Sequence, residues 1–238
     1  MHTNTNTPPA AGPRARRRQK NLARILDGAM EAIVAGGFDA LSMNKLAAAL
    51  DYTPGALYRY FPSKDALVLA LVAAVIDEIG RDLAALEGDV LDPLGRVVAG
   101  AEAWRRFSEE APNRFGLVSM LLAAPRLIVT DEALVANAMA TLLTAVRPVA
   151  TALEAATAAG DLSPGSAIER TLLLFSGVNG VLQLKKQAPR APGFLDLQRL
   201  FASMLRTLLR GWGADEAVVT RLLDAAETSA TPMPGSAT

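Results

Sequence analysis

Cysteine is absent from this chain of 238 residues, histidine occurs once, and aromatic residues make up only 5%. Without cysteine the chain can form no disulfide, thiol nucleophile or thiolate metal site, and the single histidine, His2, lies at the extreme N-terminus. A clustered pattern such as Glu-x-x-His is missing as well. The sequence therefore predicts no catalytic residues, no metal ligands and no cofactor, and an all-helical enzyme is the least favoured class of function.

Long apolar runs are also missing. The longest, residues 66–76, is bounded by Asp65 and Asp77, and it falls short of the ~18 residues that a membrane-spanning helix needs. The N-terminal stretch MHTNTNTPPAAGP lacks the basic and then apolar order of a secretory signal. We expect a soluble, cytoplasmic protein without a membrane partner.

The net charge is zero, but the charge is divided unevenly along the chain. Residues 1–65 carry nine Lys and Arg against five Asp and Glu, whereas the remaining residues carry fifteen against nineteen. A basic N-terminal module on an acidic body is the pattern expected when only the first part faces phosphate.

Apolar periodicity predicts an all-α protein. Apolar residues recur at every third or fourth step over residues 22–34, which is typical of a helix with one buried face. Gly36-Gly37 is expected to end this helix in a left-handed conformation, with Phe38 packing back on it. The residues before this helix, 1–19, are predicted to form a disordered arm that contains all but the last residue of the basic cluster RARRRQK, Arg14 to Lys20.

Two short helices follow, separated by a turn. Ser42 is a good N-cap for a helix that reaches about Leu50, and Thr53-Pro54 is typical of an N-cap and first residue of a third helix. Phe61-Pro62 should break that helix, because a residue before proline disfavours helical geometry, and Ser63 can cap the next helix. This arrangement is a helix-turn-helix unit.

The rest of the chain is predicted to be helical, with no alternating strand pattern of useful length. Proline and glycine divide it into helices at roughly 64–87, 93–110, 113–124, 131–159, 166–187 and 194–212, with a smaller helix at 215–227.

All three tyrosines of the chain fall in the segment 51–67. A helix that enters the major groove needs small side chains at its start and polar ones beyond, and the third helix has this order. Leu57 is expected to anchor it inward, while Arg59 reaches a base or a phosphate. Burial in the core remains the alternative for Tyr58 and Phe61. The candidate DNA contacts are Ser42, Asn44, Tyr52, Thr53, Pro54, Gly55, Ala56, Tyr58, Arg59, Tyr60 and Lys64.

The run LSMNKLAAALDYTPGALYRYFPSKDALVLALV resembles the DNA-binding domain of the TetR family of bacterial transcriptional regulators. The family mark is Leu-Tyr-x-x-Phe followed by Ser-Lys, which here begins at Leu57 and ends at Lys64. Two residues depart from the family pattern: Asp51 replaces a common glycine, and Tyr52 replaces a small aliphatic residue. Since aspartate tolerates the left-handed region, we expect the turn to survive. Tyr52 is expected to be partly exposed and to touch DNA.

The resemblance implies an all-helical homodimer that binds a palindromic operator and is released by a small effector, with a repressor favoured over an activator. It implies a DNA-binding domain at residues 20–65, a ligand-binding and dimerisation domain at 66–213, and a short helix and flexible tail at 214–238. Helices 166–187 and 194–212, doubled across a two-fold axis, would form the dimer interface. Ser176, Gly177 and Gly180 in the first of them suggest close helix approach.

Several alternatives stay open at this point. The chain could be a monomer that uses the same faces as core, or a helical interaction module without sequence-specific DNA binding. The segment Arg14 to Lys20 is either a basic arm on DNA or a solvated tail.

Candidate effector contacts lie on helices that would surround a pocket, and their apolar character with a few amides suits an apolar or amphiphilic effector. Simple packing is the alternative for each of them. They are Trp104, Phe107, Phe115, Met120, Asn137, Met139, Asn179 and Gln183.

Overall fold

A computed structural model describes residues 12–86, 92–123, 132–186 and 195–230, and structural statements below concern these residues. Within them the chain is built from α-helices and short 3-10 turns without a strand, which confirms the predicted fold class. The predicted disorder of residues 1–11 and the flexible tail at 231–238 lie outside the described part. No described helix is both long and apolar enough to cross a membrane.

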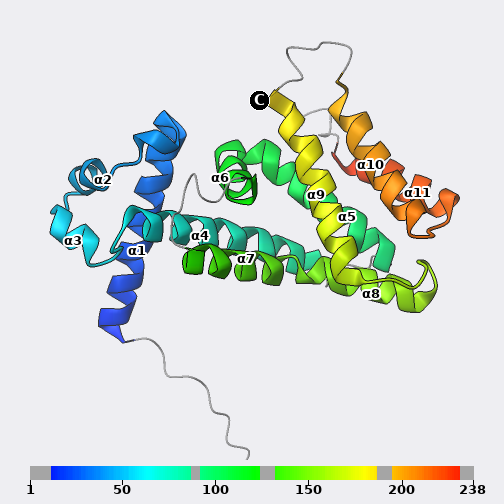
Figure 1. Cartoon of the computed structure of the whole chain (residues 1–238), viewed down its shortest axis with the longest axis horizontal. Coiled ribbons are helices and arrows are strands. Elements are labelled where there is room, and N and C mark those ends of the chain that lie inside the picture. Colours follow the sequence, from blue (N-terminus) through cyan, green and yellow to red (C-terminus); the bar gives the residue numbers. More distant parts are fainter. Residues whose placement is uncertain (1–11, 87–91, 124–131, 187–194, 231–238) are drawn as a thin grey trace, which may run out of the picture.

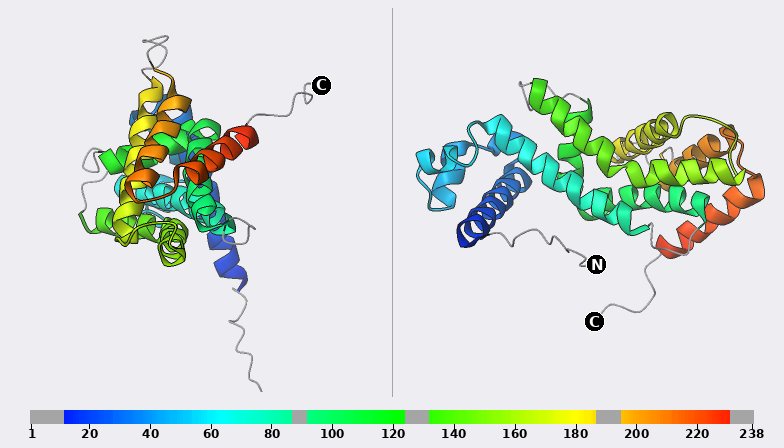
Figure 2. Two further views of the ribbon diagram at one scale, coloured as in Figure 1. Left: turned by 90° about the vertical axis from the view of Figure 1, so that its right-hand side faces the viewer. Right: turned by 90° about the horizontal axis from the view of Figure 1, so that it is seen from below.

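The first lobe is a bundle of three helices at one end of the molecule (Figures 1 and 2). Its helices are α1 (Pro13–Gly36), α2 (Met43–Ala49) and α3 (Pro54–Tyr58), with a 3-10 turn, η1 (Phe38–Ala40), between the first two. Gly37 has φ 75° and its N–H donates to the carbonyl of Ile33, so the predicted helix end is confirmed.

Helix α1 starts earlier than predicted. Residues 13–19, expected to belong to a disordered arm, form its first two turns. Proline is favoured in the first turn of a helix, and the Arg, Ala, Lys and Gln residues that follow Pro13 are good helix formers. The helix can therefore extend back to Pro13. The basic cluster is therefore carried on a helix.

The turn between α2 and α3 depends on Asp51. This residue has φ 59°, the left-handed region, and it is the one described non-glycine residue with a positive φ. The turn lets the N–H of Tyr52 donate to the carbonyl of Ala47 at 2.9 Å. Thr53 then caps α3 by accepting from the N–H of Ala56 at 3.2 Å. The survival of the turn and the Thr53 cap are both confirmed.

Helix α4 (Lys64–Ala85) joins the two parts of the molecule (Figure 1). The Ser63 hydroxyl caps it by accepting from the N–H of Ala66 at 3.0 Å, as predicted. The buried residues of α4 begin at Leu67 and end at Leu83, and they face α1 near its start and α5 to α8 farther along. Each buried side chain of this size stabilises the fold by ~1.5–3 kcal/mol, so α4 holds the two parts together.

The second part contains seven helices that pack in pairs (Figure 2). Helix α4 lies along α7, α5 along α8, and α9 along both α8 and α10, while α11 contacts α5 and α10. Their bounds are α5 (Pro93–Glu110), α6 (Pro112–Ala123), α7 (Glu132–Ala145), α8 (Arg147–Ala159), α9 (Ala167–Gln183), α10 (Leu197–Gly211) and α11 (Glu216–Ala230), with a 3-10 turn, η4 (Leu184–Lys186), after α9.

The helix predicted at 131–159 is in fact two helices. The break falls at Val146, which has φ −86° and ψ 0° and precedes Arg147-Pro148. Pro148 lacks the N–H that would continue the helix, but proline is tolerated in the first turn of a new one. The sequence prediction missed this break because it treated the proline as internal.

Close approach between α9 and α10 is confirmed at Gly177. A Cβ added there would lie 3.0 Å from Sδ of Met204, which is too close for a larger residue without displacement. Gly180 is different, because a Cβ on it would meet nothing within 4 Å.

The left-handed turn makes a clear prediction for Asp51. Replacement by valine should lower the free energy of unfolding by ~1–2 kcal/mol, because a β-branched side chain is disfavoured at positive φ. Asp51→Asn, which removes the charge but tolerates the same conformation, should remain close to wild type. Urea unfolding of the two variants checks this, and equal losses would contradict the conformational explanation.

Candidate functional site

Helix α3 presents an exposed leading edge. Thr53, Pro54 and Gly55 are exposed at its start, and Ala56 is half-buried. Tyr58 is 45% exposed at its end, and Arg59 is exposed in the turn that follows. This order leaves a narrow surface of small side chains beside a polar one, which is the shape that a major groove admits.

The opposite side of α3 is fixed by two buried residues. Leu57 is 0% exposed and Phe61 is 6% exposed, and both belong to the hydrophobic core. The structure buries Phe61 in the core, which is the alternative that the sequence left open for it. Burial was also an alternative for Tyr58, but that side chain is exposed. The anchor at Leu57 sets which side of this five-residue helix faces outward.

Tyr60 and Tyr52 connect the third helix to α1. The Oη of Tyr60 accepts a hydrogen bond from the side-chain amide of Asn21 at 2.9 Å, and its ring meets that of Tyr52 edge-on at 6.1 Å. The guanidinium groups of Arg18 and Arg24 lie over the Tyr60 and Tyr52 rings, each 5.6 Å from the ring centre. Both tyrosines are half-buried. They therefore lie beside α3 and also help to fix its position against α1.

The remaining candidate DNA contacts surround this segment. Lys64 is half-buried, with its Nζ 4.6 Å from the centre of the Phe38 ring. Ser42 occupies the N-cap position of α2 but its side chain makes no capping bond, and Asn44, two residues later, is exposed. The structure thus places all of these candidates in one lobe.

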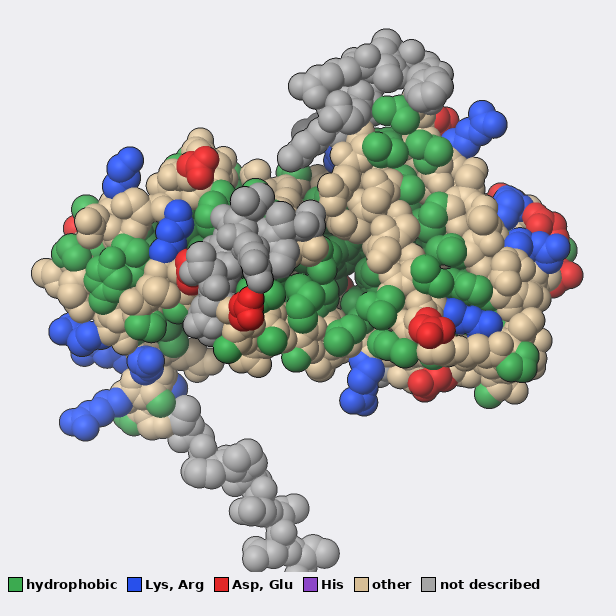
Figure 3. All heavy atoms as spheres, in the orientation of Figure 1, with side chains coloured by type: hydrophobic (Ala, Val, Ile, Leu, Met, Phe, Trp, Pro, Cys, Tyr) green, Lys and Arg blue, Asp and Glu red, His purple; other side chains and the backbone are tan. Residues whose placement is uncertain are grey.

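Positive charge gathers on the same lobe. Arg14, Arg16, Arg17 and Lys20 are exposed on the first turns of α1, and Figure 3 shows several Lys and Arg side chains on this lobe. The part of α1 that carries them is continuous with Asn21, which bonds to Tyr60. The charges therefore have a fixed orientation relative to α3.

Two family models match the chain, and together they cover more than half of it. Residues 25–71 match "Bacterial regulatory proteins, tetR family", and residues 97–208 match "Tetracyclin repressor-like, C-terminal domain". The chain belongs to the TetR family. It is accordingly a DNA-binding regulator of transcription, as the motif at Leu57 to Lys64 predicted.

Individual TetR-family proteins are similar over different shares of their length. The repressor KstR of Mycobacterium tuberculosis is 31% identical over 121 residues, which make up 45% of this chain and 50% of KstR. The chain thus spans about half the length of the curated relatives it matches. The crystal structure of the regulatory protein SCO4313 has a TM-score of 0.63 and 26% identity, covering 84% of this chain and all of that one. AibR, solved with isovaleryl coenzyme A and operator DNA, has a TM-score of 0.58 and 21% identity, covering 79% of this chain and 97% of AibR.

The second part of this TetR-family chain contains a cavity of ≈350 Å³. Trp104 of α5, Leu122 of α6, Leu142 of α7 and Phe175 of α9 contribute to its apolar walls. Figure 3 shows a hollow bordered mainly by hydrophobic side chains in this region of the molecule. Thr171, Ser176, Asn179 and Gln183, all on α9, supply its polar groups.

Trp104 occupies the centre of an aromatic cluster at the cavity wall. Its ring lies 5.6 Å from that of Phe175, almost perpendicular to it, and 6.0 Å from those of Phe107 and Phe115. Trp104 is only 2% exposed, and its indole N–H has no acceptor among the described residues. A buried donor without a partner carries an energetic cost, and such groups are uncommon in native structures.

One hydrogen bond fixes the orientation of the Asn179 side chain. The hydroxyl of Ser119 on α6 donates to Oδ1 of Asn179 at 2.9 Å. This bond engages Oδ1, and the NH₂ group of the amide makes no hydrogen bond to a described residue. Asn179 accordingly offers hydrogen-bond donors at the cavity wall.

The candidate effector contacts divide into two groups. Trp104, Asn179 and Gln183 line the cavity. Phe107 and Phe115 are buried behind Trp104, while Met120 and Asn137 are exposed and Met139 is half-buried, away from the described cavity walls. The apolar residues that complete the cavity on α6, α7 and α9 were not foreseen, since sequence periodicity identifies an apolar face but not the helix opposite it.

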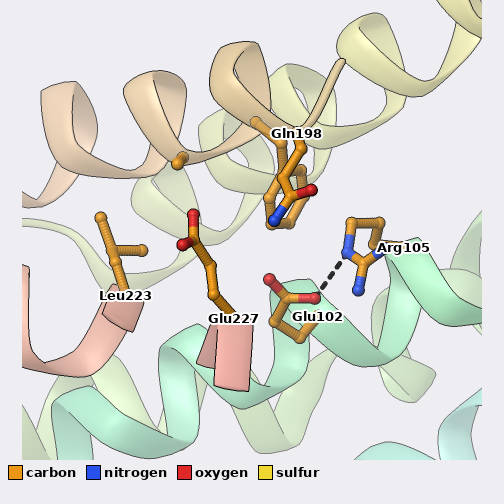
Figure 4. Close-up of a pocket in the computed structure, with 7 residues that line it drawn as sticks. Glu102, Arg105, Gln198, Leu223 and Glu227 are labelled. Atoms are coloured by element: carbon orange, nitrogen blue, oxygen red, sulfur yellow. Dashed lines mark hydrogen bonds and ion pairs between the residues drawn. The ribbon is translucent and has the colours of Figure 1, made fainter. Parts of the chain in front are cut away.

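A second cavity is too small to hold an effector. It measures ≈20 Å³ and lies between α5, α10 and α11 (Figure 4). Glu102 of α5 accepts a hydrogen bond from Nε of Arg105 at 2.6 Å beside it, and Gln198 of α10 and Leu223 of α11 are among the other residues of its wall. The space suits about one water molecule rather than an effector. The described residues also contain no group of three or more His, Cys, Asp or Glu that could hold a metal ion.

The bond between Asn21 and Tyr60 predicts a difference between two tyrosines. Tyr60→Phe should lower the free energy of unfolding by ~0.5–1.5 kcal/mol, because a half-buried amide loses its acceptor. Tyr58→Phe should change it by less than ~0.5 kcal/mol, because the Tyr58 side chain is exposed. Denaturant unfolding of both variants checks this, and a larger loss for Tyr58→Phe would contradict the assigned positioning role of Tyr60.

Proposed function

We propose that the chain is a ligand-responsive repressor that binds a palindromic operator as a homodimer. The observation that carries this proposal is the pairing of an exposed α3 with a buried Leu57 anchor in one part and a sizeable cavity in the other. AibR, whose fold this chain shares, was solved with both a small ligand and operator DNA. An operator-binding role would place the protein in the cytoplasm.

The DNA contacts follow from exposure and charge. The leading edge at Thr53 to Ala56 enters the major groove, and Arg59 reaches a base edge or a phosphate. Tyr58, Asn44, Ser42 and Lys64 hold the backbone on either side. Tyr52 and Tyr60 border the DNA while their rings support the lobe.

The basic start of α1 is proposed to contact phosphates as a helix. Arg14, Arg17 and Asn21 lie on one face of α1, since they are spaced by three and four residues. Asn21 is bonded to Tyr60, so this face continues towards the end of α3. Arg18 and Arg24 already lie over tyrosine rings, which leaves Arg14 and Arg17 better placed for DNA flanking the recognition site.

The dimer interface is proposed to involve α9 and α10. Leu173 of α9 is 54% exposed, and Leu200 of α10 and Leu184, just after α9, are each 37% exposed. An exposed row of large apolar residues is costly in water and is typical of an interface. A monomer with this surface exposed is the alternative.

Release from DNA is proposed to act through α6 and α4. Helix α6 contributes Leu122 to the cavity and Ser119 to the bond with Asn179. Near its start, Arg114 forms an ion pair with Glu78 of α4 at 2.6 Å. A ligand that repositions α6 would therefore shift α4, which carries the DNA-binding lobe, and would favour a spacing of the two lobes that no longer fits the operator.

Two other functions are less well supported. Within the described residues the cavity lacks a nucleophile paired with a base, so the chain is proposed not to be an enzyme. A helical interaction module without sequence-specific binding would not require the exposed leading edge of α3 together with the basic start of α1.

Selection of bound duplexes from random DNA tests the proposed function. A homodimer should enrich a palindrome whose half-sites are separated by ~10 bp or a multiple of it. Enrichment of a single, unrepeated site would contradict the dimer, and failure to enrich any site would contradict operator recognition.

Lys64 provides a specific prediction for phosphate binding. Lys64→Ala should weaken binding to all sequences and reduce the slope of log K against log salt by about one unit, because one phosphate contact is lost. Lys64→Arg should keep the slope, and Arg106→Ala, at an exposed position on α5, serves as a control that should change nothing. An unchanged slope for Lys64→Ala would exclude the assigned phosphate contact.

A further inference from the structure

The walls of the ≈350 Å³ cavity carry chemical information about its ligand. We propose that the effector is a small, uncharged molecule with an apolar ring-sized body and at least one hydrogen-bond acceptor that meets Asn179. This inference rests on the proposed function, because it identifies the ligand class of the cavity assigned there to the effector.

The absence of charge on the described walls disfavours strongly charged ligands. Every described lining residue is apolar or neutral and polar, and none is Lys, Arg, Asp or Glu. The one buried arginine nearby in sequence, Arg170, is bonded instead to Thr157 and to the carbonyl of Ser163. A carboxylate or ammonium placed in the cavity would lose its hydration without gaining a described partner of opposite charge, which is unfavourable.

The polar groups at the wall favour an acceptor on the ligand. Ser119 occupies Oδ1 of Asn179 at 2.9 Å and leaves the amide NH₂ as a donor. Trp104, which also borders the cavity, has an indole N–H without a described acceptor. The indole N–H of Trp104 is fully buried, so the donor that faces the ligand is the Asn179 NH₂ group. A ketone, ester or ether oxygen complements this group better than a group that can only donate, and Ser176 and Gln183 at the same wall can both donate and accept.

The remaining walls define the body of the ligand. Trp104 and Phe175 meet at 88° and form an aromatic corner, and Leu122, Leu142 and Val146 complete the apolar surface. The volume lies near the lower end of the ~300–1,000 Å³ typical of small-molecule sites. A single substituted ring fits these limits better than a long acyl chain or a nucleotide conjugate.

Three probes of nearly equal shape separate charge from hydrogen bonding. They are para-tert-butylacetophenone, which is neutral and has an acceptor, para-tert-butyl-alpha-methylstyrene, which replaces the carbonyl oxygen by a methylene group, and para-tert-butylbenzoate, which is an anion. Binding is measured without DNA by tryptophan fluorescence in Trp212→Phe, which leaves Trp104 as the sole tryptophan of the two.

The ketone should change the Trp104 emission saturably. The styrene should bind roughly fivefold to tenfold more weakly, since it cannot accept a hydrogen bond. The benzoate should bind at least about 100-fold more weakly, since its charge would be buried without a partner. Equal binding of the ketone and the styrene would overturn the proposal that the ligand carries a hydrogen-bond acceptor. Binding of the benzoate as tight as that of the ketone would overturn the proposal that the ligand is uncharged. No saturable binding of any probe would overturn both proposals.

A pair of matched variants tests the role of Asn179. In Asn179→Leu the preference for ketone over styrene should fall to about onefold while styrene binding persists, which also shows that the cavity remains folded. Gln183→Leu makes the same change one turn along α9 and should keep the preference. Loss of the preference in Gln183→Leu but not in Asn179→Leu would overturn the assignment to Asn179.

The outcome is separable from that of the proposed function. If duplex selection yields an operator but no probe binds, the regulator stands and the ligand class fails. If the probes bind in the predicted order but never reduce operator binding, the ligand class stands and the proposed release fails.

Discussion

The structure depends on the burial of helix α4. Its apolar residues pack against α1 close to the DNA-binding lobe and against α5 to α8 in the second part, so the two parts share one continuous core. This shared helix means that a change in the second part has a direct physical route to the orientation of α3. The ion pair between Glu78 and Arg114 lies on that route, but it is half-exposed and contributes less to stability than the apolar contacts of α4.

Within the first lobe, the residues that hold α3 are distinct from those that face outward. Leu57 and Phe61 are buried, whereas Arg59 and Tyr58 are exposed, and a left-handed Asp51 makes the turn that brings them there. Tyr60 is intermediate between the two groups, because it is half-buried and is held by Asn21 and Arg18 of α1. The unusual Tyr52 is explained in part by this network, where its ring supports that of Tyr60 and lies under Arg24.

Much of the fold could be predicted because the chain marks its helix ends with proline, glycine and capping residues. The limits of α5 were predicted to the residue, from Asp92-Pro93 and Ala111-Pro112. The break at Val146 was missed because proline is compatible with both a helix interior kink and a new first turn. The cavity could not be predicted in full, because its walls come from α5, α6, α7 and α9, and the bond between Ser119 and Asn179 joins residues 60 positions apart. Nor does residue type separate Trp104, at the wall, from Phe107 and Phe115 behind it.

The central claim has two parts. The dimer holds its two α3 helices at a spacing that matches the operator, and occupancy of the cavity changes this spacing. Since the chain has no native cysteine, a single Ala49→Cys change on the exposed side of α2 places one spin label on each lobe. Pulsed electron paramagnetic resonance should then give one narrow distance between labels on the selected operator, and saturation with para-tert-butylacetophenone should move or broaden it. A distance distribution that is identical with the cavity empty and saturated, or the lack of any distance between labels on the operator, would contradict the account.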